Sequence, residues 1–358
     1  MPAIAVAAPP VALTCGSTVT GSVALSQDLV CSGDAITLLG GTLDLRSHTI
    51  SGDGTGTAVT LGTVTDDFST ITATVENGTI TDFATGFQTP SDGGVQLLTV
   101  RNVSITQSYD GILGTGINNL LLDDVTLRND SDIAVLADQT LVTVTHATIA
   151  HSGTAFSVIN DGGVTGGNMA VDDNASAGDC SQGYFKVKGS EFARNAAGLN
   201  LDQCEGSVFT DSAFLNNGIA AITEVQGLDS FANPTLSISN DHFRGNLVGL
   251  QLSDQAMAVS VSNSVFTFNG SGIVMDVCAP EDAPCLPIVD QFTSNRFAQN
   301  HGDGVTWGDG TVTMTSNKFQ SNSGWGFFAG PGTTVVDGGA NVAQSNNAGD
   351  CNGGLVCS

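Results

Sequence analysis

The chain has 358 residues, of which 12% are charged, 41% are hydrophobic and 45 are glycine. Its 35 acidic and 9 basic residues give a formal net charge of −26 at pH 7, so the surface should repel nucleic acid and anionic membranes, and neither is expected as a partner. The same charge disfavours polyanionic sugars such as pectate or alginate unless calcium neutralises both sides. The scarcity of charged residues and the abundance of glycine favour short strands and tight turns over long helices.

The chain begins MPAIAVAAPP, which resembles the end of a signal peptide or an added tail, and residues 1–14 are predicted to precede the folded domain. No apolar run of about 18 residues occurs, so no transmembrane span is predicted. The cysteines form four neighbouring pairs without a CxxC motif, which favours local disulfides and secretion over a metal site. The pairs are Cys15 with Cys31, Cys180 with Cys204, Cys278 with Cys285, and Cys351 with Cys357.

An internal repeat with a period near 22 residues organises most of the chain. Each repeat has an apolar position, an asparagine three residues later in the C-terminal repeats, and then a small residue followed by an apolar alternation. Alternation with a period of two predicts a strand with one face in the core, and the repeat period predicts a solenoid of short coils. The apolar position is held by Ile80, Ile105, Leu127, Ile149, Phe192, Phe214, Phe243, Phe266, Phe297 and Phe319, and the asparagines are Asn195, Asn217, Asn246, Asn269, Asn300 and Asn322.

The repeated N-x-F-x-x-N-x-x-G-[IL]-x-[LM] resembles the β-helix repeat of the pectate-lyase-like, carbohydrate-binding and sugar-hydrolysis class, over roughly residues 35–342. The resemblance implies an all-β fold, a single-stranded right-handed parallel β-helix with roughly 10–12 coils. We expect this helix over residues 15–350, including an N-terminal cap at 15–34, and a C-terminal disulfide cap at 351–358. Such caps cover the apolar core and the strand edges of the end coils.

Three insertions follow the same element of the repeat, which is the strand that begins after the asparagine turn. They fall within residues 160–187, 226–232 and 278–285, and the first is either an irregular coil or a long loop. Insertions on one side of a solenoid usually build the walls of its binding face. In the enzymes that the chain resembles, this strand lines the substrate cleft. Disulfides would tie the first insertion to Cys204 and close the third.

Three acidic residues are predicted to share one register on this strand, because each stands ten residues after the phenylalanine of its coil. The alternation turns Asp202 and Asp276 outward, whereas Glu224 fits either an outward position or a bulge. Adjacent coils lie about 4.8 Å apart, so such a row has the carboxyl spacing of glycosidases. The row also fits a calcium site with oxygen ligands, or plain solvated surface.

Polar residues around this row are candidate substrate contacts. Some are predicted to point outward from the same strand, two arginines stand in the turn that enters it, and an exposed tryptophan can stack on a sugar ring. These candidates are Asn200, Gln251, Ser253, Arg194, Arg244 and Trp325.

A further candidate acid is Asp303, in the stretch NHGDGVTW. Asn300 in this stretch belongs to the repeat, and Asp110 occupies the equivalent turn of an earlier coil. Trp307 falls at an alternate, inward position and is expected to pack in the core.

The pattern predicts a secreted enzyme that acts on an extracellular polysaccharide, with glycoside hydrolysis preferred because carboxylates dominate the candidate face. The alternative is a non-catalytic carbohydrate-binding or structural β-helix, and the third hypothesis is a calcium-dependent lyase or epimerase. Elimination needs a base beside the uronate; Tyr109 is among the few candidates, and no full lyase signature surrounds them. No cofactor is required, Ca²⁺ enters only under the calcium-dependent hypotheses, and a monomer is expected.

Overall fold

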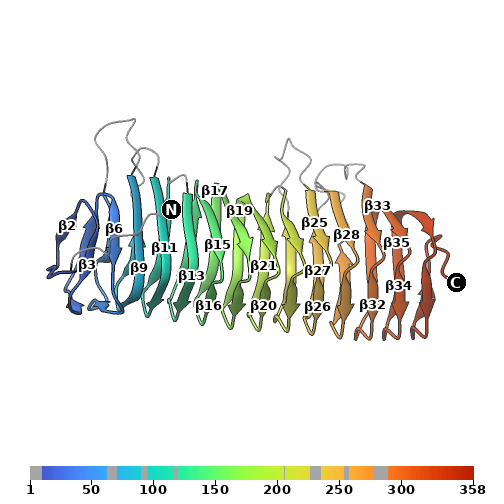
Figure 1. Cartoon of the computed structure of the whole chain (residues 1–358). Coiled ribbons are helices and arrows are strands. Elements are labelled where there is room, and N and C mark those ends of the chain that lie inside the picture. The colour runs from blue at the N-terminus through green and yellow to red at the C-terminus, as the bar shows by residue number, and fades with distance from the viewer. Residues whose placement is uncertain are drawn as a thin grey trace, which may run out of the picture. The chain divides into compact units, whose positions relative to one another are not determined.

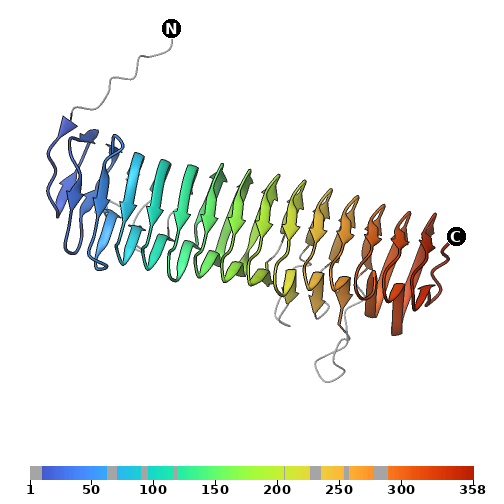
Figure 2. The ribbon, with the colours of Figure 1, turned by 90° about the horizontal axis from the view of Figure 1, so that it is seen from below.

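A computed structural model of the protein describes residues 10–62, 71–89, 96–116, 119–204, 206–225, 235–253, 258–276 and 289–358. The chain divides into two compact units, unit 1 (residues 1–169) and unit 2 (residues 170–358). Within the described ranges all regular elements are strands. In each unit the strands of successive coils pair in parallel, as Figures 1 and 2 show from two sides.

Each coil of unit 1 passes through three strand positions, which we call A, B and C in chain order. β9 (Ile71–Thr81), β11 (Gln96–Thr106) and β13 (Asn119–Arg128) run from B into C without a break. The A strands are β2 (Ser17–Val19), β5 (Ile36–Leu38), β8 (Thr57–Leu61), β10 (Thr85–Gln88), β12 (Asp110–Thr115), β14 (Ile133–Asp138) and the first part of β17 (Thr154–Gly167). The other B strands are β1 (Pro10–Val11), β3 (Val23–Leu25), β6 (Gly41–Asp44), β15 (Leu141–Thr145) and the last part of β17, and the other C strands are β4 (Leu29–Val30), β7 (Thr49–Ser51) and β16 (Thr148–Ala150).

Unit 2 repeats the same three positions. Its A strands are β21 (Ala197–Asp202), β24 (Ala220–Val225), β27 (Val248–Ser253), β30 (Ser271–Met275), β37 (Gly349–Cys351) and the first parts of β19 (Ser176–Lys188), β33 (Val305–Thr315) and β35 (Trp325–Gly339). Its B strands are β22 (Val208–Thr210), β25 (Thr235–Ser239), β28 (Ala258–Ser262), β31 (Val289–Thr293) and the last parts of β19, β33 and β35. Its C strands are β18 (Ala170–Asp172), β20 (Glu191–Ala193), β23 (Ala213–Leu215), β26 (His242–Arg244), β29 (Val265–Thr267), β32 (Arg296–Ala298), β34 (Lys318–Gln320) and β36 (Val342–Gln344).

The phenylalanines of the repeat form a continuous stack in the core of unit 2. Ring centroids of Phe192, Phe214 and Phe243 follow one another at 5.0 and 4.8 Å, and the stack continues through Phe266, Phe297 and Phe319 at 4.5, 5.0 and 5.3 Å. All six rings are buried. Parallel register between C strands places each ring directly over the ring of the coil before it, so the predicted aromatic ladder is confirmed.

The asparagines of the repeat form a buried ladder in the turn between the C and A strands of unit 2. Asn246 is representative: its Oδ1 accepts from the backbone N–H and the Nδ2 of Asn217 at 2.9 and 3.0 Å, and its own Nδ2 donates to Phe214 O and Asn269 Oδ1. The ladder satisfies turn amides that would otherwise be buried without partners. It includes the six predicted asparagines and extends to Asn174 and Asn346.

Residues 160–187 form strands of the solenoid, so the notion of a wall loop at this place is wrong. Residues 163–167 pair with β15, and residues 176–181 and 186–188 pair with β21 and β22. The segment supplies the B and C positions of one coil and the A and B positions of the next. Its glycines fit strand positions where neighbouring backbone lies close. The other two predicted insertions, 226–232 and 278–285, lie outside the described residues.

Three of the predicted disulfides are present, namely Cys15–Cys31, Cys180–Cys204 and Cys351–Cys357. Cys278 and Cys285 lie outside the described residues. Cys180 and Cys204 are buried within unit 2, with Cys180 in register with Leu201, so this bond links neighbouring coils in the core. It does not staple an external loop.

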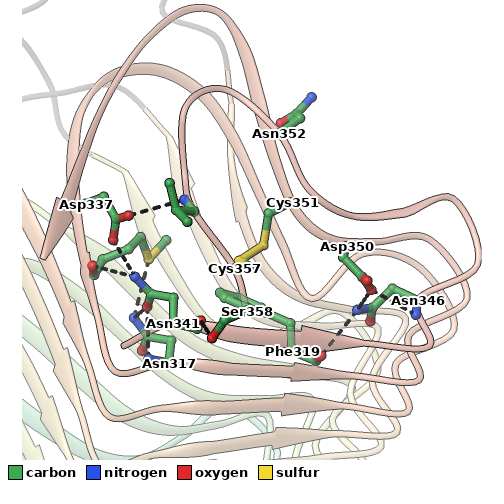
Figure 3. The surroundings of a disulfide bond; sticks show 12 residues. Asn317, Phe319, Asp337, Asn341, Asn346, Asp350, Cys351, Asn352, Cys357 and Ser358 are labelled. Atoms are coloured by element: carbon green, nitrogen blue, oxygen red, sulfur yellow. Dashed lines mark hydrogen bonds between the residues drawn. A yellow bond between two sulfur atoms is a disulfide. The ribbon is translucent and has the colours of Figure 1, made fainter. Parts of the chain in front are cut away.

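The C-terminal disulfide lies beside the ends of two polar ladders (Figure 3). Asn346 ends the asparagine ladder by donating to Asp350 at 2.9 Å, and Asn341 ends a second ladder by donating to Asp337 at 2.9 Å. A carboxylate accepts hydrogen bonds and so ends each ladder without a further coil, and the hydrogen bond from the N–H of Gly339 lowers the pKa of Asp337.

At the N-terminus, the predicted cap at residues 15–34 carries β2, β3 and β4, which pair with the next coil. No described helix is long and apolar enough to cross a membrane.

Candidate active site

The predicted acidic row does not form, because Glu224 lies one residue out of register with Asp202. Asp202 pairs with Val225, whereas Glu224 pairs with Leu201 and Leu252 and is only 2% exposed. Relative to its neighbours, this coil has one extra residue between Asn217 and the start of β24. A shift of one residue reverses which face a side chain occupies, so Glu224 points into the core.

Asp202 and Asp276 do occupy the outer face of the A strands but lie far apart. The register runs from Asp202 through Val225 and Ser253, and Asp276 follows directly after Met275, which pairs with Leu252. Three coil steps correspond to about 14 Å, which exceeds the carboxyl separation of either glycosidase class. Asp276 instead accepts a hydrogen bond from Gln251 at 3.3 Å.

The other candidate residues of unit 2 differ in exposure and in their contacts. Asn200 is exposed and Gln251 half-buried, both on the outer face as predicted, whereas the side chain of Ser253 lies outside the described residues. Arg194 is ion-paired with Asp172 and Asp173. Arg244 lies over the ring of Phe268 at 5.3 Å.

Asp303 holds its own turn together. Its Oδ1 accepts the backbone N–H of Trp325 at 2.6 Å, and its Oδ2 accepts from Thr306 Oγ1 at 2.7 Å. Trp325 is half-buried, with its ring 6.0 Å from that of Phe328. Trp307 is fully buried, as predicted. Both carboxylate oxygens of Asp303 therefore accept hydrogen bonds from the protein, and these bonds hold the turn in place.

A different group of acids meets in unit 1, in the turn that enters β12 and β14. It comprises Tyr109 and Asp110 on one coil and Asp130 and Asp132 on the next, and we call it the unit 1 acid cluster. The backbone N–H of Asp132 donates to Tyr109 O at 2.9 Å, and that of Ile133 donates to Asp110 Oδ1 at 3.4 Å. These contacts bring the two coils into register at the cluster.

The members of the cluster have unlike environments. Burial raises the pKa of Asp110, and the nearby charge of Asp132 adds to the effect. Tyr109 is 57% exposed, and its hydrogen bond to Asp132 raises the pKa of its phenol. Asp130 is fully buried at the turn position that asparagine holds in unit 2, and burial raises its pKa to about 7. Its Oδ1 accepts the N–H of Ser108 at 3.2 Å.

The sequence contains a signal for this cluster that the phenylalanine-based counting passed over. Tyr109 and Asp110 precede a strand, and Asp130 and Asp132 do the same about one coil period later. Three acids and a tyrosine at a common phase of the repeat point to one turn shared by two coils. Among the residues that the structure describes, no group of three or more His, Cys, Asp or Glu side chains is arranged to hold a metal ion.

Comparisons with solved structures find similar folds at low sequence identity. The A-module of the Azotobacter vinelandii mannuronan C-5 epimerase AlgE6 is 13% identical with a TM-score of 0.54, covering 94% of this chain and 91% of that chain. The catalytic domain of a GH87 alpha-1,3-glucanase in complex with tetrasaccharides is 10% identical, with a TM-score of 0.45 and 88% and 64% coverage. The periplasmic alginate epimerase AlgG is 15% identical, with a TM-score of 0.42 and 77% and 62% coverage. The chain thus spans less than two thirds of the last two.

No curated protein matches the chain in sequence. Residues 131–279 match the family model described as the right handed beta helix region. This match and the parallel pairing of A, B and C strands in both units identify the fold as a right-handed parallel β-helix.

Proposed function

We propose that the protein is a polysaccharide-active enzyme, with Asp110 and Asp132 of unit 1 as its acid–base pair. The observation that carries this proposal is the unlike environment of two carboxyl groups on neighbouring coils. Burial raises the pKa of Asp110, whereas Asp132 accepts a hydrogen bond from Tyr109. Two carboxyl groups in unlike surroundings suit unlike roles, one as a proton donor and one as a nucleophile or base.

Glycoside hydrolysis uses such a pair directly. Asp110 would protonate the glycosidic oxygen, and Asp132 would attack the anomeric carbon or take a proton from the attacking water. The two residues lie on adjacent coils, one position out of register, because Ile112 pairs with Val135 and the N–H of Asp132 donates to Tyr109 O. They are close enough for the charge of Asp132 to act on Asp110. Tyr109 would orient the carboxylate of Asp132 through its hydroxyl.

The same tyrosine disfavours elimination. A lyase or epimerase needs a base that removes the proton beside a uronate carboxyl group. The hydrogen bond to Asp132 raises the pKa of Tyr109, so the phenol keeps its proton at neutral pH and is a poor base. The net charge of −26 also opposes a uronate polymer.

We therefore place the substrate among neutral extracellular polysaccharides. The β-helix modules to which the chain is similar include a mannuronan epimerase, and this likeness supports a polymeric sugar as the substrate class. The three disulfides support secretion, because such bonds persist mainly in oxidising compartments. No residue beyond those of unit 1 is required for the proposed chemistry.

The first prediction tests this pair. The protein should release reducing ends from at least one member of a panel of neutral polysaccharides, and Asp110→Asn and Asp132→Asn should each lower turnover by about 10²–10⁴-fold. Asp161→Asn is a matched control, because Asp161 is exposed in unit 1 with a φ of 64° that asparagine also adopts. Its turnover should equal that of the wild type.

Other outcomes of this experiment would favour a different reaction or a different site. Absorbance from unsaturated uronate products would favour a lyase, and full activity in both cluster variants would exclude the pair. The earlier candidates, Asp202 and Asp276 in unit 2, serve as a second arm of the experiment. Loss of turnover in Asp202→Asn or Asp276→Asn, with the cluster variants active, would move the site to the outer face of unit 2.

A further inference from the structure

Unit 1 carries an open groove of about 300 Å³ at the bend between its B and C strands. The bend occurs within β9, β11 and β13, at three residues with left-handed backbone, namely Asn77, Asn102 and Asp124 (φ 62°, 52° and 55°). Two residues further on, Thr79, Ser104 and Thr126 also line the groove and lie in register on the three coils. The groove therefore presents one amide-and-carboxylate row and one hydroxyl row. The three strands lie side by side in Figure 1.

Hydrogen bonds along the first row all point the same way. Asn77 Nδ2 donates to Asp44 Oδ1 at 3.1 Å, and Asn102 Nδ2 donates to Asn77 Oδ1 at 3.0 Å. In each asparagine the amide nitrogen faces the preceding coil, so the carbonyl of Asn102 faces the coil of Asp124. There the pattern stops, because the side chain of Asp124 has no amide N–H to donate to Asn102.

The row thus ends in two acceptors on adjacent coils. In the described part of the chain, no protein donor contacts Asn102 Oδ1 or the carboxylate of Asp124. The buried ladder of unit 2 contrasts with this, because from Asn195 to Asn322 each asparagine carbonyl accepts from the coil before it. A ligand that supplies hydrogen-bond donors at the spacing of the coils would complete the row.

Hydroxyl groups of a sugar chain are such donors. The coil spacing of about 4.8 Å is near the length of one pyranose residue in an extended glycan, and the hydroxyls of Thr79, Ser104 and Thr126 can donate or accept as the sugar requires. The open carboxylate of Asp124 disfavours an anionic sugar. Arg101 does not offset it, because this guanidinium is ion-paired with Glu76.

We propose that this groove binds a neutral polysaccharide as a non-catalytic subsite on unit 1. The groove lies at the B-to-C bend, whereas the acid cluster lies in the turn after the C strand, so the two sites share coils but no lining residue. Binding here needs no catalysis, and the inference stands independently of the proposed acid–base pair. It would hold a polymer on the enzyme between cleavage events, or hold it without cleavage.

The test is calorimetric titration of the full chain with hexasaccharides of β-1,4-glucan, β-1,3-glucan, α-1,3-glucan, α-1,4-glucan and β-1,4-mannan, and with a mannuronate hexamer. At least one neutral hexamer should bind, and the mannuronate should bind more weakly. Asp124→Asn should weaken binding at least fivefold, because an amide there can donate to Asn102 Oδ1 and complete the row without ligand. For the same reason it should raise the unfolding midpoint.

Two further variants separate this site from the catalytic one. Ser104→Val removes a hydroxyl from the second row and should also weaken binding at least fivefold, whereas Asp161→Asn should leave it unchanged. Asp110→Asn should bind as the wild type does even if it loses turnover. Failure of every neutral hexamer to bind, tighter binding of the mannuronate, or equal affinity in the wild type and both groove variants would overturn the proposal. Binding without turnover on any polysaccharide would refute the catalytic proposal alone.

Discussion

The turn between the C and A strands is filled differently in the two units. In unit 2 it holds an unbroken row of asparagines, and those from Asn195 to Asn322 are buried and both donate and accept hydrogen bonds. In unit 1 the same position holds Ser108, Asp130 and Ser152, and Asp130 Oδ2 is buried without a hydrogen-bond partner. In an amide ladder each side chain supplies both the donor and the acceptor that its neighbours need. A carboxyl group in the same place has a pKa that depends on burial.

Breaking the asparagine ladder of unit 2 should have the largest effect on stability. Asn246→Ala removes the acceptor of two Asn217 donors and the donor to Phe214 O, all in a buried turn. Because several buried polar groups lose their partners, the free energy of unfolding should fall by about 3 kcal/mol. Urea denaturation followed by circular dichroism measures this, with Asn200→Ala, at an exposed position of β21, beside it as the control. An equal midpoint in the two variants would mean that the ladder adds little.

The interrupted ladder of unit 1 predicts a pH dependence of the opposite kind to that of ordinary surface acids. Burial raises the pKa of Asp130 from 3.8 to about 7, so between these values the folded chain holds a proton that the unfolded chain has lost. Stability from this group is fully present below pH 3.8 and is lost as the pH rises toward 7, with a slope of about 1.4 kcal/mol per pH unit. Asp241 and Asp290 of unit 2 have the same shift from burial and add to the slope.

Asp130→Asn should therefore make the pH slope of the unfolding free energy shallower by the contribution of one group. Relative to the wild type, the variant should gain more stability at pH 7 than at pH 5. Unfolding midpoints measured from pH 4 to pH 8 would show the change. Asp161→Asn, which alters an exposed acid of the same unit, should leave the slope as it is. A slope that is identical in the wild type and Asp130→Asn would show that Asp130 ionises normally in the folded chain.

The same contrast explains what could be predicted from the sequence. The phenylalanine and asparagine ladders repeat with the coil period, so counting residues was sufficient to find them. Counting from Phe214 failed for Glu224, because one extra residue at Gly218–Ile219 lies between the two and reverses the strand face. The turn absorbs such an insertion without a change in composition, so only the strand pairing reveals it.

The acid cluster and the groove were harder to find for a related reason. Asp130 and Asp124 derive their properties from where they replace asparagine, and from burial or from the direction of the neighbouring amides. Both depend on contacts between coils about 22 residues apart. The repeat predicts which residues stack, but it does not predict where a polar ladder ends or which atom is left without a donor.

The smallest expected effect concerns the aromatic stack, which is also specific to unit 2. The C strands of unit 1 carry Ile80, Ile105 and Leu127 at this position, and these are buried as fully as the phenylalanines. Phe243→Leu should therefore be accommodated, at a cost of about 1 kcal/mol, because it exchanges a ring for a smaller apolar group within a packed stack.

A double-mutant cycle with Phe266→Leu isolates the contribution of ring stacking, since the two centroids lie 4.5 Å apart with an interplanar angle of 3°. The coupling should be about 0.5 kcal/mol or more. The pair Phe192 and Phe266, whose rings are not in contact, supplies the reference cycle and should show additive effects. If both cycles are additive, the rings serve only to fill the core of unit 2, and isoleucine or leucine in unit 1 is their full equivalent.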